Sequence, residues 1–413
     1  MKPVYIVSWL FALAISFVSC DDWLDKTPKD RLYPDVYFKT EDELRLFTNQ
    51  FYNNLVPSAV DIYSESSDLI VKSDLMLEMS GQRIIPDEGN GWNFTALRDI
   101  NFYLQYSHNC TEVNARNRYD GVARFFRAYF YFEKVKRYGD IPWYDKALDS
   151  DDPELYKARD SREFVMQKML EDLDFAIANL PKTKNAYVLT RWTALALKSR
   201  VCLFEGTFRK YHGLEDCEKY LNACVSASET FMNESGYTLY KSGSTPYRDL
   251  FASINLQADE VIFGRDYEAS LSVLHNVQNY ENSTTMGRPG MNKKIVNSYL
   301  MADGSRFTDK AGYETMTFDQ ECQNRDPRLA QTIRTPGYTR IGSTKKEAPN
   351  LAYTMTGYHL IKYSMTANYD EYNKSCNDIP LFRTAEVYLN FAEAKAELGT
   401  LKQADINKSI KLL

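Results

Sequence analysis

Apolar residues recur at helical spacing, three and four positions apart, through much of residues 40–232 and again after residue 383. The first run follows Thr40-Glu-Asp-Glu43, a capping box in which side chains and backbone satisfy one another's hydrogen bonds at a helix start. One face of that helix would carry Leu44, Phe47, Phe51 and Leu55. Because such helices bury their apolar faces against one another, we expect an all-α, mainly helical fold.

Further helices are expected over residues 92–104, 122–138, 161–180, 190–203, 214–232, 383–398 and 406–413. Gly139 would end the second of these, and Pro181 follows the third. After Arg383 the inward residues are expected to be Ala385, Tyr388, Leu389 and Ala392. Small inward residues and short connections are typical of tetratricopeptide-like helix pairs. The strict consensus of that repeat is absent, so a non-repetitive helical domain is the alternative.

Residues 236–380 break the helical pattern with Gly-Ser and Pro-Gly turns. We expect long irregular loops there, with a few short strands such as Val261-Ile-Phe263 and a short helix near Asn292. The sequence therefore predicts a helical region over 20–235 and a loop-rich region over 236–413. The apolar run at 406–413 carries no cap, which predicts that the loop-rich region is incomplete at its C-terminus.

The N-terminus has the layout of a lipoprotein export signal. Lys2 precedes an apolar run over residues 4–18, and Ser19-Cys20 is followed by the acidic pair Asp21-Asp22. The run is shorter than the ~20 residues that a membrane-spanning helix needs, and it fits a cleaved signal peptide over residues 1–19. Cys20 would then be acylated as the first mature residue. An ordinary secretory signal ending in a chance cysteine is the alternative.

Composition and motifs argue against several classes of function. A net charge of −6 and a pI near 5.5 disfavour a nucleic-acid partner. The four histidines, His108, His212, His275 and His359, show no metal-ligand spacing, and the other cysteines are scattered. Neither a Gly-x-Ser-x-Gly elbow nor a phosphate-binding glycine loop is present in the sequence. We therefore predict a protein that is not an enzyme and that uses no metal or cofactor.

Several motifs together resemble one family. Cys20-Asp-Asp-Trp-Leu-Asp-Lys-Thr-Pro28, followed by Tyr37-Phe38 and the capped helix at Thr40, resembles the mature start of the SusD/RagB outer-membrane lipoproteins of Bacteroidetes. The segment from Arg124 to Phe132, leading to Arg137-Tyr-Gly-Asp-Ile-Pro-Trp143, is similar to the most diagnostic stretch of that family. Matching segments follow in the same order at 171–181, 190–200, 326–329 and 383–394.

The resemblance implies a scaffold of tetratricopeptide-like helix pairs whose loops present a ligand site. It also implies a surface receptor in the outer membrane, held by a lipid anchor, that captures a glycan or oligosaccharide, or in some relatives a peptide. The receptor would pass its ligand to a SusC-like, TonB-dependent transporter. Members of the family are not enzymes, and they usually continue beyond the equivalent of Leu413. A surface glycoside hydrolase and a tetratricopeptide-type scaffold for proteins or peptides are the alternatives.

Two loop segments carry the residues expected to bind the ligand. A glycan receptor needs flat aromatic surfaces for sugar C–H groups, and amides or charged groups for hydroxyls. The first segment, 81–93, offers Arg83, Asn90, Trp92 and Asn93; the second, 279–290, offers Tyr280, Asn282 and Arg288. Trp92 could instead pack against its neighbours at the start of the helix expected over 92–104.

Overall fold

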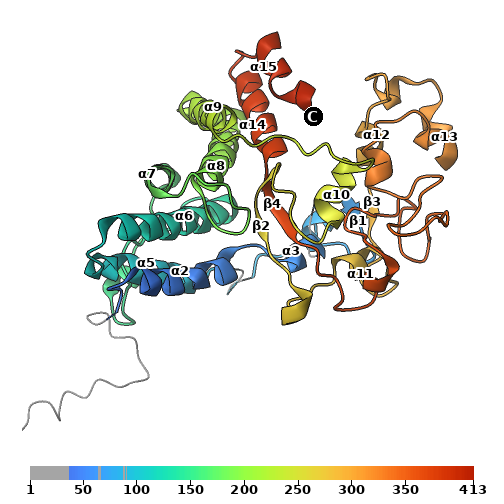
Figure 1. Cartoon of the computed structure of the whole chain (residues 1–413). Helices are drawn as coiled ribbons and strands as arrows, with labels where there is room; N and C mark the ends of the chain where they lie inside the picture. The colour runs from blue at the N-terminus through green and yellow to red at the C-terminus, as the bar shows by residue number, and fades with distance from the viewer. Residues whose placement is uncertain (1–36, 64–66, 87–88, 90) are drawn as a thin grey trace, which may run out of the picture.

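The computed structural model describes residues 37–63, 67–86, 89 and 91–413 (Figure 1). Its longer helices are α2 (Glu41–Leu55), α5 (Thr95–Tyr106), α6 (Val113–Tyr138), α7 (Arg162–Asn179), α8 (Arg191–Tyr211), α9 (Cys217–Glu234) and α14 (Thr384–Glu397). Shorter helices are α3 (Ala59–Tyr63), α4 (Leu77–Ser80), α10 (Pro246–Ala252), α11 (Val277–Glu281), α12 (Lys293–Ser298), α13 (Phe318–Cys322) and α15 (Gln403–Asn407). The long helices stack on one side of the molecule, and irregular segments that carry α10 to α13 form the other.

Local capping explains where the long helices begin. The hydroxyl of Thr40 accepts a hydrogen bond from the N–H of Glu43, whose carboxylate accepts the N–H of Thr40 in return. Ser161 caps α7 by accepting the N–H of Phe164, and Thr190 caps α8. Gly139 follows the end of α6 with φ of +71°, a conformation that glycine adopts without strain. These starts and this stop agree with the boundaries predicted from the sequence.

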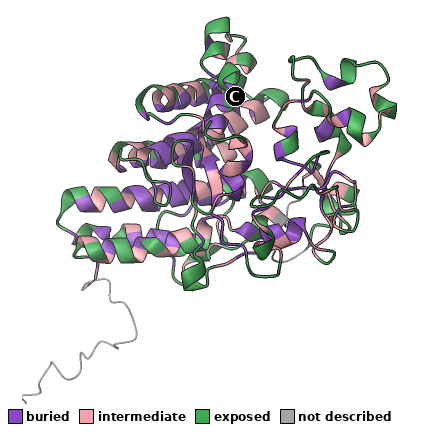
Figure 2. Cartoon of the chain, turned by 45° about the vertical axis from the view of Figure 1, so that its right-hand side comes forward, coloured by how far each residue is buried: buried purple, intermediate pink, exposed green. Residues whose placement is uncertain are grey.

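The core of the helical side lies around α6, which packs against α2, α5 and α7. Its inward face is aromatic: Phe125, Phe126, Phe130, Tyr131 and Phe132 are all at most 5% exposed. Figure 2 shows the buried faces of the stacked helices turned toward one another, whereas much of the irregular side is exposed. The predicted apolar stripe is thus the core of the helix stack.

Helices α8 and α9 pack closely because small residues lie between them. The hydroxyls of Ser199 and Ser228 are 2.8 Å apart, and both residues are fully buried. Helix α14 returns from the far end of the chain to join this pair, where Asn390 donates to the Ser199 hydroxyl at 3.1 Å. Helix α14, which belongs to the predicted loop-rich region over 236–413, therefore packs against helices of the predicted helical region over 20–235.

Two short antiparallel strand pairs connect distant segments. Strand β2 (Val261–Arg265) pairs with β4 (Ile379–Arg383), with Arg265 opposite Ile379, and β1 (Ile70–Val71) pairs with β3 (Gly290–Met291). The β2–β4 pair lies between the helix stack and the irregular side, directly before α14 (Figure 1). A mainly helical fold with long loops and a few short strands is thus confirmed.

Some boundaries and orientations differ from the predictions. The helix expected from residue 92 begins at Thr95, whose N–H is bound by the side-chain oxygen of Asn93. The run over 406–413 forms the end of α15 and a 3-10 turn at Ile410–Leu412 rather than one helix. Leu389, expected to point inward, is 47% exposed because the inward face of α14 is turned toward α8 and α9. Among the residues described, no helix is long and apolar enough to cross a membrane.

Cys20 and the signal peptide predicted at 1–19 lie outside the residues that the structure describes. The six cysteines within the described part are free thiols, and four of them, Cys110, Cys202, Cys224 and Cys376, are buried as small apolar residues.

Candidate functional site

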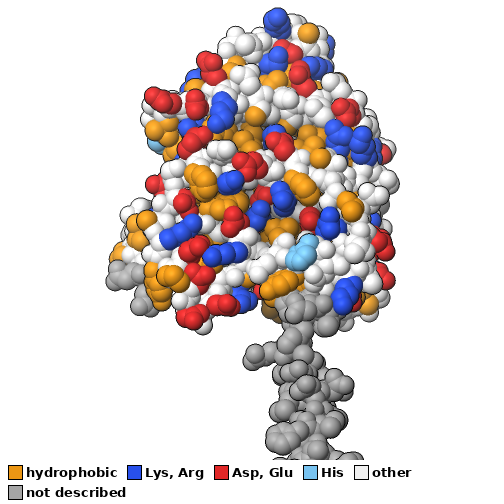
Figure 3. Space-filling view, turned by 90° about the vertical axis from the view of Figure 1, so that its left-hand side faces the viewer, with side chains coloured by type: hydrophobic (Ala, Val, Ile, Leu, Met, Phe, Trp, Pro, Cys, Tyr) orange, Lys and Arg blue, Asp and Glu red, His pale blue; other side chains and the backbone are white. Residues whose placement is uncertain are grey.

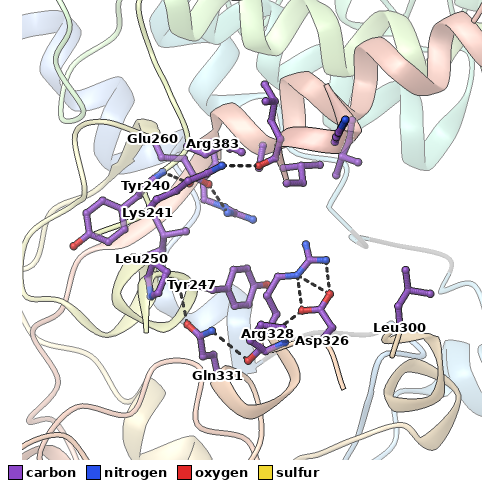
Figure 4. A pocket seen from close by; sticks show the side chains of 18 of the residues that line it. Tyr240, Lys241, Tyr247, Leu250, Glu260, Leu300, Asp326, Arg328, Gln331 and Arg383 are labelled. Carbon is purple, nitrogen blue, oxygen red and sulfur yellow. Dashed lines mark hydrogen bonds and ion pairs between the residues drawn. The ribbon is translucent and has the colours of Figure 1, made fainter. Parts of the chain in front are cut away.

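A hollow with a volume of about 910 Å³ forms on the described part of the molecule, where three distant parts of the chain meet. Residues 239–260 form one wall, residues 300–331 a second, and residues 383–413 the third (Figure 4). We call it the central depression. It is open to solvent and lies beside the strand pair that joins the helix stack to the irregular side.

Two partly exposed tyrosines line the central depression. The backbone N–H of Tyr240 donates to the Glu260 carboxylate at 2.9 Å, and that of Tyr247 donates to the side-chain oxygen of Gln331 at 3.0 Å. The ring of Tyr247 also meets Phe251 edge to face, with centroids 5.4 Å apart. The walls therefore hold the backbone of both tyrosines, Phe251 also supports the Tyr247 ring, and each ring can offer an apolar surface to a bound molecule.

Charged side chains surround these tyrosines. The Glu260 carboxylate is 3% exposed and accepts a hydrogen bond from the Arg383 guanidinium at 2.8 Å. Arg328 forms a bidentate pair with Asp326, and this hydrogen bonding holds the pKa of Asp326 below its ordinary value. Over the whole lining there are four cationic side chains, Lys241, Arg328, Arg383 and Lys411, and two carboxylates, Glu260 and Asp326.

A second pocket, of about 590 Å³, shares Leu300 with the central depression. We call it the side pocket. Its lining consists of Lys294, Asn297, Ser298, Leu300, Arg306, Thr308 and Tyr313. Apart from Leu300, every one of these side chains carries a polar or charged group, which makes the side pocket suited to a polar ligand.

The first predicted segment forms a separate site around Trp92. Trp92 is 39% exposed and lines a pocket of about 290 Å³ beside α5. Its ring meets Phe94 and Tyr138 edge to face, and the guanidinium of Arg159 lies 4.9 Å from the ring centroid. Trp92 is thus both packed and partly accessible.

The other residues of this segment make local contacts. Arg83 forms an exposed ion pair with Glu78 at 3.5 Å, and the Asn93 side-chain oxygen accepts the N–H of Thr95. Asn90 lies outside the described residues.

The second predicted segment is largely internal. Tyr280 is 3% exposed and Asn282 is 6% exposed. The Asn282 side-chain oxygen accepts hydrogen bonds from Arg334 at 2.7 Å and Arg340 at 3.1 Å. Tyr280 and Asn282 therefore support the irregular side from within, which corrects the expectation that they face a ligand.

Arg288 binds the chain beside it, donating to the carbonyls of Leu351 and Ala352 at 2.8 and 3.0 Å. The two predicted segments do not share a pocket. Among the described residues of 81–93 only Trp92 lines the Trp92 pocket, and none of the described residues of 279–290 lines that pocket, the central depression or the side pocket. No local sequence pattern marks Tyr240 or Tyr247 as ligand-binding residues, and the segments 326–329 and 383–394 stand out only through their resemblance to family motifs.

The buried histidines, His275 and His359, have a structural role. Burial lowers the pKa of His275 to about 4 and that of His359 to about 3, so both rings are neutral near pH 7. Each uses its Nε2 in a hydrogen bond with a backbone carbonyl, of Asn377 and Glu281 respectively. Within the described part of the chain, no three metal-ligating side chains gather at one place.

Comparison with known proteins identifies the fold and the family. A profile described as the SusD family matches residues 250–413, and one described as starch-binding, associating with the outer membrane, matches residues 81–191. SusD-like protein P2 of Formosa agariphila is 25% identical over 416 aligned positions, covering 94% of this chain and 76% of that protein.

Solved structures share the same architecture. A SusD-like protein of Bacteroides fragilis is 21% identical, with a TM-score of 0.72 over 92% of this chain and 80% of its own. A SusD-like carbohydrate binding protein of the same species is 18% identical, with a TM-score of 0.73 over 91% and 78%. A structure named for its xylogluco-oligosaccharide has a TM-score of 0.59 at 18% identity over 85% and 70%.

The architecture is thus that of the mainly helical, SusD-like proteins. The chain belongs to the SusD/RagB family, as the sequence motifs predict. This membership places it among non-catalytic binding proteins, so the alternative of a surface glycoside hydrolase is set aside.

Proposed function

We propose that this protein is a cell-surface receptor that captures an oligosaccharide in the central depression and passes it to a SusC-like, TonB-dependent transporter. The proposal rests on the depression itself, which is about 910 Å³ in volume. Two tyrosines and several charged side chains line it, and the backbone of each tyrosine is hydrogen-bonded to the wall. The similarity to proteins named for carbohydrate binding and for a xylogluco-oligosaccharide supports the same ligand class.

The lining has the groups that a sugar chain requires. The faces of Tyr240 and Tyr247 can stack on sugar C–H groups, while Arg328, Gln331 and Arg383 stand within the same walls to hydrogen-bond hydroxyls. An open depression of this size accommodates several linked sugar units, because ligand pockets for drug-sized molecules already occupy ~300–1,000 Å³.

Anchoring and delivery complete the proposal. Acylation of Cys20 would hold the receptor in the outer membrane, since several acyl chains together anchor a protein stably. The matching family profile, described as associating with the outer membrane, supports that location. We further propose that Arg83, Asn90, Trp92, Asn93 and Arg288 contact parts of the ligand that extend beyond the depression, because the described members of this set are at least partly exposed.

A binding assay with tyrosine variants tests the receptor function. Glycan-array screening of the mature protein would supply the ligand, and calorimetry would then compare it with Tyr240→Ala and Tyr247→Ala. Each variant should lose about 1–2 kcal/mol of binding free energy, or roughly tenfold in Kd. Tyr156→Ala, at a tyrosine that is 87% exposed and outside the depression, is the matched control.

Two results would contradict the proposal. One is unchanged affinity in both tyrosine variants. The other is the appearance of new reducing ends during incubation of the protein with its glycan.

A further inference from the structure

We propose that the ligand of this receptor is an acidic oligosaccharide, and that Lys294 and Arg306 of the side pocket bind its anionic group. The inference rests on the proposed function, and it adds the class of sugar. The anionic group is a carboxylate of a uronic acid or a sulfate ester, since a guanidinium and an ammonium group recognise both.

The charged side chains that line the side pocket are both cationic. Its lining includes Lys294 and Arg306 and not one aspartate or glutamate. Within the described part of the chain, neither cation forms an ion pair. The adjacent lysine behaves differently, because Lys293 pairs with the buried carboxylate of Glu321 at 2.9 Å. Lys294 and Arg306 are thus cations that the fold leaves available to a ligand.

Both cations lie on segments whose backbone is held by hydrogen bonds or by packing. Lys294 lies in the first turn of α12, where the Asn292 side chain accepts its N–H at 3.0 Å. The far end of α12 is bound by Arg325, which donates to the carbonyls of Val296 at 2.6 Å and Tyr299 at 2.8 Å.

The same arginine supports the opposite wall. Arg306 directly precedes Phe307, whose ring is buried. The guanidinium of Arg325 lies 3.8 Å from the centroid of that ring. The Tyr313 ring meets Phe307 edge to face at 5.8 Å. Arg325 therefore fixes the two cation-bearing segments relative to each other, and the pocket between them is ordered before any ligand arrives.

The neighbouring central depression extends this positive charge. Its lining has four cationic side chains against two carboxylates, so it too is positive on balance. The chain as a whole carries a net charge of −6, and the helix face seen in Figure 3 mixes acidic and basic groups throughout. A positive stretch from the central depression past Leu300 into the side pocket therefore favours an anionic chain over a neutral one.

The chemistry of the side pocket fits an acidic sugar. The guanidinium of Arg306 can form two parallel hydrogen bonds with a carboxylate or sulfate, and the ammonium group of Lys294 can donate a third. Thr308 supplies a hydroxyl group to the same lining, and the Tyr313 hydroxyl, which donates to the Glu314 carboxylate at 3.3 Å, can still accept a hydrogen bond from a sugar hydroxyl. A neutral sugar would offer both cations hydroxyl acceptors only, which bind them less strongly than an anionic group does.

Calorimetry on the full mature protein would test the inference. The probes are an oligogalacturonide, the same oligomer fully methyl-esterified, a sulfated galactan oligosaccharide and a neutral glucan oligosaccharide. We expect an acidic probe to bind at least tenfold more tightly than the uncharged ones, and this preference to weaken as salt increases. The double variant Lys294→Gln/Arg306→Gln should lose most of the preference, whereas Lys310→Gln, at an exposed lysine outside the pocket, should keep it.

The outcomes separate the two proposals. Binding of the uronate or of the sulfated probe alone, lost in the double variant, supports the inference and identifies the anionic group. Equal binding of charged and uncharged probes, unchanged in the double variant, overturns the inference and leaves the receptor function standing. Failure of every saccharide to bind, with a normal melting curve, overturns the proposed function itself.

Discussion

Buried polar side chains hold the irregular side together. Arg334 and Arg340 are at most 7% exposed, and both donate to the Asn282 side-chain oxygen. Arg334 also pairs with Glu347 at 3.0 Å, and Arg340 pairs with Asp370. A buried charge is tolerated only when it is paired and hydrogen-bonded, so this cluster fixes the loops that surround it. Asn282 is essential to that cluster, which is a role that no local sequence pattern indicates.

Glu281 predicts a pH dependence of stability at this same place. Its side chain is 2% exposed and accepts hydrogen bonds from Ser364 at 2.7 Å and the N–H of Tyr363 at 3.1 Å. Burial raises its pKa from 4.5 to about 7, although Arg248 and Lys362 act in the opposite direction. Since the folded-state pKa exceeds the unfolded one, the contribution of Glu281 to stability is complete below about pH 4.5 and is lost as the pH rises through about 7.

Urea unfolding of Glu281→Gln would measure this effect. Between pH 4.5 and 8, the unfolding free energy of the unchanged protein should fall by about 2–3 kcal/mol relative to that of the variant, because glutamine cannot ionise. Glu215→Gln, at an exposed residue, is the control and should give a constant difference. A constant difference for Glu281→Gln as well would show that this carboxylate is not titrating in the folded protein.

The helices were the most predictable part of the fold. Thr40, Ser161 and Thr190 cap α2, α7 and α8, as the sequence indicates, because a capping hydroxyl acts on N–H groups only a few residues away. The orientation of Leu389 could not be predicted in the same way. It depends on which face of α14 meets α8 and α9, and those helices lie almost two hundred residues earlier in the chain.

The contact between α8 and α9 predicts a sharp response to one methyl group. A Cβ at Gly206 would lie 2.7 Å from Leu221 on α9, so Gly206→Ala should force the helices apart and cost about 1–3 kcal/mol of unfolding free energy. Gly121→Ala on α6 is the matched control, because its Cβ would meet Leu180 at an ordinary 3.4 Å. The unfolding free energy of Gly121→Ala should rise by up to about 1 kcal/mol, because alanine has a higher helix propensity than glycine. Equal stability changes in thermal unfolding would contradict this account of the close packing.

The candidate site illustrates what the sequence could not supply. Its walls come from residues 239–260, 300–331 and 383–413, and only the fold brings them together. Each segment alone shows an ordinary mixture of tyrosine, arginine and acid. Trp92 was found because a tryptophan in a glycine-rich loop is conspicuous, and it lines a pocket of its own. Family motifs at Asp326 and Arg383 marked two of the three walls without indicating that they face one another.

The proposed transfer to a transporter makes a prediction for the whole cell. In cells that lack the SusC-like partner, labelled oligosaccharide should still bind at the surface, since capture requires only the central depression. Uptake should fall to the level of cells without the receptor, because in this proposal the transporter carries the ligand across the membrane. Fluorescence measured before and after removal of surface label separates the two quantities. Undiminished uptake in those cells would contradict the transfer.

The β2–β4 pair carries a consequence for how this architecture can vary. It joins Arg265 to Ile379, so residues 266–378 leave the helix stack and return to it at nearly the same point. Lengthening a loop adds closure entropy only slowly, as the logarithm of its length. Segments within that excursion can therefore be exchanged or extended with little effect on the helices, which lets one scaffold be fitted to many different nutrients.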